Sequence, residues 1–234
     1  MENKPYWICG THSVIQAILN ENRKIDEVWC SSLEKIKKIK VKKKFKILEK
    51  KNNEISKIFK NEDKFIHQGL AAKIYPLNKI EFKELLKKKP RTLIVLDNIF
   101  DQRNIGSIIR TSYAFGVDVI ISSEKTVNLK SNSLHKASSG YVEFMNIVTT
   151  SNVINNIITL KKNGYYIIGL DSNSKNHFNI IKEHEFKVFV FGSEGKGIRE
   201  NILKKCDSIV SIKMKNNVDS LNVSNSAAII LSQI

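Results

Sequence analysis

The sequence has few of the residues that build disulfide frameworks and metal sites. Its 234 residues include three cysteines, at positions 9, 30 and 206, without a CxxC pair. An odd number of cysteines without this spacing argues against a disulfide framework or a zinc site and favours a reducing compartment, the cytoplasm. The five histidines are not grouped with Cys, Asp or Glu at metal-ligand spacing, so we expect no metal.

Long apolar runs and the common nucleotide-binding loops are also missing. No uninterrupted apolar stretch approaches the roughly 20 residues of a membrane span, and the N-terminus lacks the basic-then-apolar pattern of a secretory signal. We therefore expect no membrane association. The chain has neither the GxxxxGK[ST] spacing of a P-loop nor a GxGxxG after an apolar run, which excludes two frequent phosphate-binding loops.

Positive charge is abundant, but arginine is scarce. The net charge is +16, and residues 1–90 carry 22 Lys and Arg against 11 Asp and Glu, a net +11. A phosphate-rich partner such as a nucleic acid is the simplest functional reading. A composition rich in Lys, Asn and Ile, as an AT-rich genome imposes, is the alternative. Three of the five arginines, Arg103, Arg110 and Arg199, lie in or beside polar stretches that follow apolar runs.

The pattern of apolar residues predicts two domains, residues 1–75 and 91–234, joined by a linker at 76–90. In the first domain we expect a helix to residue 19 capped by Thr11 or Ser13, a strand at 25–30, and helix–strand–helix within the lysine-rich residues 33–60. From residue 91 onward, short strands alternate with helices, which predicts an α/β domain with a mostly parallel sheet. The expected helices include 104–115, with Phe115 on its apolar side, and 198–205.

Three short polar stretches in the second domain each follow an apolar run. They are Asn104-Ile-Gly-Ser-Ile-Ile-Arg110, Gly192-Ser-Glu-Gly-Lys-Gly197 and Ser220-Leu-Asn-Val-Ser224. Ligands of open α/β sheets bind at strand ends of this kind, so these stretches predict one shared site. Helix capping is the structural alternative for three of the side chains: Glu194 for the helix 198–205, and Ser220 and Asn222 for the final helix.

The three stretches, in this order, resemble the three motifs of the SpoU/TrmH branch of SPOUT RNA 2′-O-methyltransferases. The resemblance covers residues 91–234 and includes Lys136-Ala-Ser-Ser-Gly140. It implies a C-terminal trefoil knot, S-adenosylmethionine as cofactor and a homodimer. Carried over by motif, it implies active-site roles for Asn104, Arg110, Glu194, Ser220 and Asn222, and backbone contacts to the cofactor from Gly192, Ile212 and Leu221. Two departures from the family pattern are Ile212-Lys-Met214, where Ile-Pro-Met is usual, and the polar pair Asn225-Ser226.

The first domain resembles the small ribosomal-protein-like RNA-binding domain of the bacterial 23S rRNA guanosine 2′-O-methyltransferases. The matching residues are Gly10-Thr-His-Ser-Val14 and His67-Gln-Gly-Leu-Ala71. The resemblance implies methyl transfer to a ribose 2′-hydroxyl, with a guanosine of 23S rRNA as the leading substrate. Transfer to tRNA is one alternative, and a non-catalytic RNA-binding or ribosome-assembly protein is another.

Overall fold

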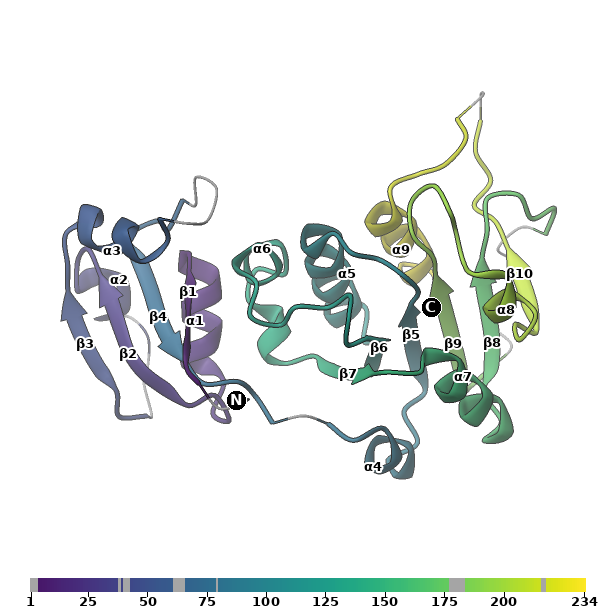
Figure 1. Cartoon of the computed structure of the whole chain (residues 1–234), viewed down its shortest axis with the longest axis horizontal. Helices are drawn as coiled ribbons and strands as arrows, with labels where there is room; N and C mark the ends of the chain where they lie inside the picture. Colours follow the sequence, from purple (N-terminus) through teal and green to yellow (C-terminus); the bar gives the residue numbers. More distant parts are fainter. Residues whose placement is uncertain are drawn as a thin grey trace. The chain divides into compact units, whose positions relative to one another are not determined.

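The computed structural model describes residues 4–37, 39, 43–60, 66–78, 80–176, 184–215 and 218–234. Contacts between residues divide the chain into two compact units (Figure 1). The first unit consists of Met1–Asn78 with Leu129–Phe144, and the second consists of Lys79–Asn128 with Met145–Ile234. The boundary between the two units at Asn78 lies inside the linker predicted at 76–90. The segment Leu129–Phe144, in contrast, groups with the N-terminal residues and not with the rest of 91–234.

The first unit contains a four-stranded sheet with helices on both faces. Its strands are β1 (Tyr6–Cys9), β2 (Ile25–Cys30), β3 (Lys46–Glu49) and β4 (Leu70–Ile74), in the order β1-β4-β2-β3. Its helices before residue 60 are α1 (Thr11–Leu19), α2 (Glu34–Lys37) and α3 (Asn52–Ile58). The strand predicted at 25–30 and the helix–strand–helix order within 33–60 are confirmed, although Lys38, Lys40 and Lys42 of that segment lie outside the described residues.

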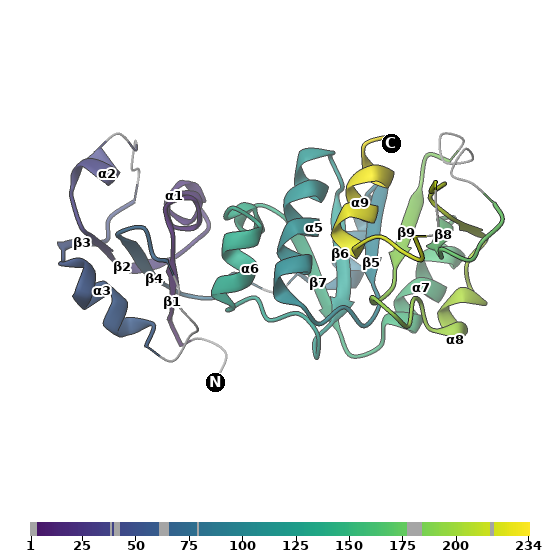
Figure 2. The same cartoon turned by 90° about the horizontal axis from the view of Figure 1, so that it is seen from above.

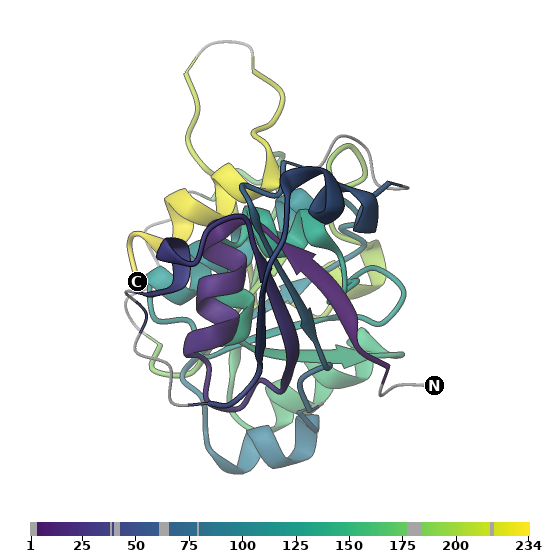
Figure 3. The same ribbon diagram turned by 90° about the vertical axis from the view of Figure 1, so that its left-hand side faces the viewer.

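Alternation along the strands explains the two faces of this sheet. The fully buried Ile8, Val28 and Ala72 share a cluster with α1, whereas their neighbours Cys9 and Ala71 share another with Ile55 of α3. Successive side chains of a strand point to opposite faces, so each strand contributes to both layers. Figure 3 shows α1, in purple, along the sheet.

The start of α1 differs from the prediction. The residue that caps α1 is Gly10, at φ 100°, and no side chain makes a capping hydrogen bond there. Thr11 and Ser13 both lie inside the helix, so neither is its cap. Glycine is favoured at Gly10 because this backbone conformation is costly for a residue with a Cβ atom.

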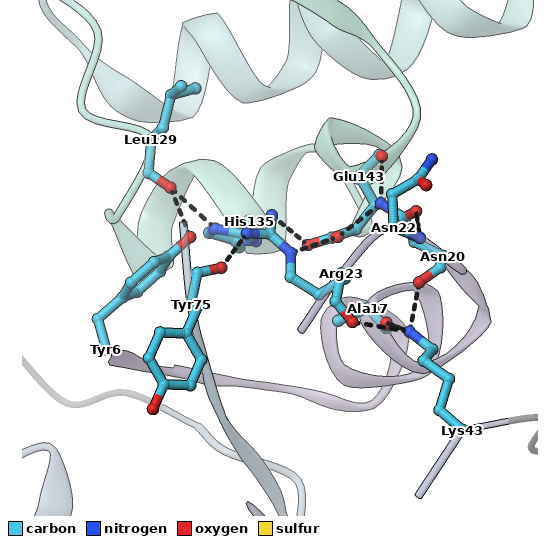
Figure 4. A network of polar contacts seen from close by, with 10 residues as sticks. All are labelled: Tyr6, Ala17, Asn20, Asn22, Arg23, Lys43, Tyr75, Leu129, His135 and Glu143. Carbon is cyan, nitrogen blue, oxygen red and sulfur yellow. Dashed lines mark hydrogen bonds and ion pairs between the residues drawn. The ribbon is translucent and has the colours of Figure 1, made fainter. Parts of the chain in front are cut away.

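The segment Leu129–Phe144 is tied to the first unit by buried polar contacts. It contains α6 (Asn132–Ala137) and the 3-10 turn η1 (Tyr141–Glu143). Arg23 donates to the Glu143 carboxylate from Nε at 2.8 Å and from Nη2 at 3.0 Å, and both side chains are almost fully buried (Figure 4). The Cys9 amide donates to Asn132 Oδ1 at 3.0 Å. These bonds satisfy groups that would be costly to bury alone.

His135 of α6 makes the stability of this unit depend on pH. It is fully buried, with Nε2 3.0 Å from the Leu129 carbonyl oxygen, and burial lowers the pKa of His135 to about 4. An unfolded histidine has a pKa of about 6.5. The unfolded chain therefore binds more protons between these values, and stability falls as the pH is lowered through this window. The contribution of His135 is about 3 kcal/mol in total.

We expect this loss to appear in urea unfolding between pH 7 and pH 4. Both tryptophans, Trp7 and Trp29, lie in the first unit, so their fluorescence reports its unfolding. His135→Gln keeps a donor for the Leu129 carbonyl and should give a visibly flatter pH dependence. An equal loss of stability in the wild type and the variant would contradict the assignment.

The second unit contains a six-stranded, wholly parallel sheet, which confirms the predicted α/β class. Its strands are β5 (Thr92–Leu96), β6 (Val119–Ser123), β7 (Asn146–Thr150), β8 (Tyr166–Leu170), β9 (Lys187–Phe191) and β10 (Ser208–Val210), in the order β10-β8-β9-β5-β6-β7. Its helices are α4 (Phe82–Lys87), α5 (Gln102–Ala114), α7 (Val153–Lys162), α8 (Glu200–Leu203) and α9 (Val223–Leu231).

Helices pack against the buried side chains of this sheet. Residues of α4, α7 and α8 share one core cluster with alternate residues of the strands, such as Leu93 and Val95. Helices α5 and α9 lie side by side (Figure 2), and α5 buries Ile105, Ile108 and Ile109. No helix among the described residues has both the length and the apolar composition needed to cross a bilayer.

Several predicted boundaries in the second unit are wrong by a few residues. Helix α5 begins at Gln102, because Asp101 caps it by accepting from the Arg103 amide, so Asn104 lies in its first turn. Phe115, which we expected on the apolar side, is 44% exposed at the helix end. The helix predicted at 198–205 shortens to Glu200–Leu203.

Candidate active site

The site begins where two central strands end side by side. Strands β5 and β9 are parallel, with Leu96 opposite Phe191, so the next residues, Asp97 and Gly192, enter their loops from the same edge. The Asp97 amide donates to the Phe191 carbonyl oxygen at 2.8 Å, which extends the pairing by one residue. The carboxyl edge of a parallel sheet is the usual location of a ligand site.

A buried carboxylate fixes the loop after β9. Asp97 is fully buried and accepts from the Arg199 amide at 2.9 Å and from the Arg199 guanidinium at 2.8 Å and 2.6 Å. A buried carboxylate requires such donors, so the contact holds residue 199 against the end of β5. Arg199 was noted from the sequence but Asp97 was not, although the position of Asp97 directly after an apolar strand was an available signal.

The loop 192–197 folds tightly back on itself. The backbones of Ser193 and Gly197 exchange hydrogen bonds of 3.1 Å and 2.9 Å. A Cβ atom on Gly192 would lie 2.1 Å from the carbonyl carbon of Gly197 and 2.3 Å from the Ile198 nitrogen. Gly192 is therefore required by the close approach of the loop's own backbone, a reason that the spacing of the glycines did not reveal.

Three of the predicted residues form one hydrogen-bonded cluster. The Asn104 amide group donates to Glu194 Oε1 at 2.9 Å, and the Asn222 amide group donates to the same oxygen at 2.6 Å and to Asn104 Oδ1 at 3.0 Å. The cluster joins α5, the loop after β9 and the start of α9. One carboxylate thus orients two amide side chains. Among the described hydrogen bonds, Asn104 uses one of its two N–H donors, whereas the Asn222 amide is fully used because its Oδ1 also accepts from the Ser224 amide and hydroxyl.

The capping alternatives have different outcomes for the three side chains. Asn222 does cap α9, since its Oδ1 accepts from the Ser224 amide at 2.9 Å, so it combines capping with membership of the cluster. Glu194 does not cap α8, because Arg199 occupies that position. It accepts instead from the side-chain amides of Asn104 and Asn222 and, at 3.5 Å, from the Val223 backbone amide. Ser220 is exposed in the segment before α9 and takes no part in the cluster bonds.

Arg110 does not join this cluster within one chain. Its side chain is exposed. At about 100° per residue, it projects about 120° around the α5 axis from Asn104. The buried face of α5, centred near Ile108 and Ile109, points elsewhere. Sequence spacing placed Arg110 under two turns from Asn104, but the two side chains leave the helix in different directions.

The residues predicted to hold a cofactor lie along the same edge. Gly192 follows β9 directly, Ile212 follows β10, and Leu221 precedes Asn222, all three being half-buried. Together they offer backbone amides and carbonyls beside partly apolar side chains, a donor set that fits the adenosine portion of S-adenosylmethionine. Asn225 of the atypical pair is exposed on α9, and Ser226 is half-buried. The described residues contain no group of three or more potential metal ligands.

Known solved structures share this fold over nearly the whole chain. The chain is similar to the SpoU methyltransferase AviRb from Streptomyces viridochromogenes in complex with AdoMet, with a TM-score of 0.81, 16% identity and coverage of 98% of this chain and 89% of that one. It is also similar to an AdoMet-bound rRNA methyltransferase from Sinorhizobium meliloti, with a TM-score of 0.80, 22% identity and coverage of 97% and 85%. At these identities, the likeness establishes the fold.

Sequence comparison establishes the family. The chain is 34% identical over 174 residues to a Staphylococcus aureus (strain COL) protein named "Putative TrmH family tRNA/rRNA methyltransferase", covering 72% of this chain and 70% of the relative. The family model described as RNA 2′-O ribose methyltransferase substrate binding matches residues 7–80, and that of the SpoU rRNA Methylase family matches residues 91–232. The chain is an RNA methyltransferase that belongs to the SpoU rRNA methylase family.

Proposed function

We propose that this protein methylates the ribose 2′-hydroxyl of an RNA, a guanosine of 23S rRNA, with S-adenosylmethionine as methyl donor. The observation that carries the proposal is the cluster of Asn104, Glu194 and Asn222 at the carboxyl ends of the strands. It gathers one side chain from each of the three family motifs. The substrate-binding match over residues 7–80 supports RNA as the acceptor.

The cluster is suited to orienting a ribose. S-adenosylmethionine, when bound, supplies an electrophilic methyl group on a sulfonium. Glu194 holds the amide groups of Asn104 and Asn222 in fixed positions, and the second N–H of the Asn104 amide can orient a hydroxyl for attack by hydrogen bonding. Gly192, Ile212 and Leu221 would hold the cofactor through their backbone groups. Ser220, exposed in the segment before α9, would contact the RNA.

Arg110 acts as a fixed cation in this proposal. A guanidinium resists deprotonation in proteins, so we assign it to charge stabilisation and not to proton removal. Its planar fork can hold a phosphate or the developing oxyanion with two hydrogen bonds. Because Arg110 lies away from the cluster in one chain, we propose that it reaches the reacting ribose in the implied homodimer or after RNA binds.

Arg110→Lys keeps the charge and removes the fork. We expect the rate of single-turnover methylation to fall at least about tenfold, the scale of one weakened transition-state contact. Rapid-quench assays with saturating S-adenosylmethionine would measure it. Arg91→Lys, at an exposed position of the second unit, is the matched control. A variant with near-wild-type turnover would show that the fork is unimportant.

The function itself is tested by transfer of labelled methyl groups to unmodified 23S rRNA and, separately, to unmodified tRNA. Label recovered as 2′-O-methylguanosine in 23S rRNA, and lost in Arg110→Ala, would support the whole proposal. Label in tRNA alone would keep the chemistry and change the substrate. Failure of the protein to bind S-adenosylmethionine would favour a non-catalytic RNA-binding protein.

The homodimer and the C-terminal trefoil knot implied by the resemblance, and the cytoplasmic location expected from the cysteines, belong to the same proposal. The dimer would bring a second copy of Arg110 and of the exposed Ile229 on α9 into its contact. Light scattering coupled to size-exclusion chromatography tests this part directly. A monomer at micromolar concentration that retains methyl transfer would contradict it.

A further inference from the structure

A polar turn in the first unit is held in an unusual backbone conformation. Gln68, at φ 54°, and Gly69, at φ 74°, both lie in the left-handed region just before β4. The Gly69 amide donates to His67 Nδ1 at 3.0 Å, so the neutral ring carries its proton on Nε2, which lies 2.9 Å from Ser56 Oγ. Burial, followed by the charges of Lys136 and Lys35, lowers the pKa of His67.

Two lysines from different parts of the chain converge on this turn. Lys35 of α2 donates to the Gln68 carbonyl oxygen, and Lys136 of α6 donates to the Ile66 carbonyl oxygen, both at 2.6 Å. A hydrogen bond to a carbonyl positions an ammonium group without neutralising its charge. The turn therefore places two fixed positive charges around His67, which explains why both lysines act on its pKa.

A hollow of about 300 Å³ opens beside the turn. Lys35, Asn52, Ser56, His67 and Gly69 are among the residues that line it. A Cβ atom on Gly69 would lie 2.2 Å from Ser31 Oγ and 2.4 Å from Lys35 Nζ, so glycine lets Lys35 approach the turn closely. The described lining residues offer ammonium, amide, hydroxyl and imidazole groups and include no carboxylate. Such donors are typical of contacts to a nucleic-acid backbone.

We propose that this hollow, with Lys35 and Lys136 beside it, binds a backbone phosphate of the RNA substrate. The inference rests on the proposed function, because it takes RNA as the acceptor. It adds Lys136, which lies outside the matched residues 7–80, to the groups that hold the RNA. Helix α6 can supply this lysine because Asn132 accepts from the Cys9 amide at 3.0 Å and anchors α6 to β1.

A purely structural role for the two lysines predicts a different result. If they only brace the turn, their removal should lower the melting temperature and leave the salt dependence of RNA binding unchanged. A phosphate contact releases counterions, and each lost contact reduces the slope of log K against log salt by about 0.7 to 0.9. At ~0.1 M salt, the same contact contributes about five- to tenfold in affinity.

The experiment measures binding of a 23S rRNA transcript by the full-length protein at several salt concentrations. The variants are Lys35→Gln, Lys136→Gln and their combination, with Lys162→Gln on α7 as a control that removes the same charge. We expect each single variant to weaken binding about five- to tenfold and to reduce the salt slope by nearly one unit. S-adenosylmethionine binding, measured by calorimetry, and the melting temperature should stay at wild-type values.

Binding and salt slopes equal to those of Lys162→Gln would overturn the proposal. Lower melting temperatures with unchanged salt slopes would also overturn it, in favour of bracing. Rescue of the salt slope by Lys136→Arg would support it, because arginine keeps the charge. Failure of the proposed function would be visible separately. The wild-type protein would then transfer no methyl group, while the lysine variants would still alter the salt slope of RNA binding.

Discussion

Arg23→Ala should destabilise the first unit by about 3 to 5 kcal/mol, the usual cost of leaving one member of a buried ion pair alone. Arg23 is the main partner of Glu143, whose side chain is fully buried. It also donates to the Tyr75 carbonyl oxygen at 2.6 Å (Figure 4). In the variant, the Asn20 amide group, which donates to Glu143 Oε2 at 3.2 Å, would be the remaining partner of this carboxylate among the side chains of Figure 4.

Urea unfolding followed by tryptophan fluorescence measures this loss. Lys73→Ala is the matched control within the first unit, because the Lys73–Asp26 pair is 32% and 43% exposed and a pair of this kind contributes at most about 1 kcal/mol. The double variant Arg23→Met with Glu143→Leu removes both charges and should recover much of the lost stability. Equal effects of Arg23→Ala and Lys73→Ala would contradict the assigned role of the buried pair.

Gly192→Ala should reduce single-turnover methylation about a hundredfold, the scale expected when a catalytic group moves by about 1 Å. The added methyl group would lie 2.1 Å from the carbonyl carbon of Gly197, whereas carbon atoms in contact prefer about 3.5 to 4.0 Å. The loop must therefore open. Glu194, only two residues further on, would be displaced from the amide groups of Asn104 and Asn222.

Gly195→Ala provides the control within the same loop. A Cβ atom there meets no atom within 4 Å, although the backbone is at φ 85°. That variant is destabilised only by the strain of alanine in the left-handed backbone region, about 1 to 2 kcal/mol, and not by a clash. We expect calorimetry to show weaker S-adenosylmethionine binding for Gly192→Ala than for Gly195→Ala. Equal cofactor affinities and equal rates would show that the close approach at Gly192 has no role in the site.

Local sequence patterns predicted the helices and strands whose positions depend on neighbouring residues. The strand predicted at 25–30 lies at its observed position, and the final helix, for which Asn222 was a candidate cap, begins at Val223. The alternation of buried side chains in strands and the spacing in helices are properties of neighbouring residues. Boundaries failed where a single cap decided them, as at Gly10 and Asp101.

Lysine content was a weaker guide. Composition alone does not show whether the lysines of residues 33–60 meet RNA or only solvent. Lys43 does neither in the structure, since its ammonium group donates to the carbonyl oxygens of Ala17, Asn20 and Arg23 near the end of α1. Lys35 instead lies at the hollow beside Gly69. Composition cannot separate these roles, because both use the same side chain.

The sequence alone determined the α/β class, the order of the three motifs and their attachment to strand ends, because these features follow from periodicity and residue type within short windows. The tertiary structure decided which distant groups meet. Asp97 and Arg199 are 102 positions apart, and Arg23 and Glu143 are 120 apart. The fold also placed Arg110 away from Asn104 and joined Leu129–Phe144 to the first unit. Such pairings depend on strand order and on the burial of charged groups, which no short window of sequence encodes.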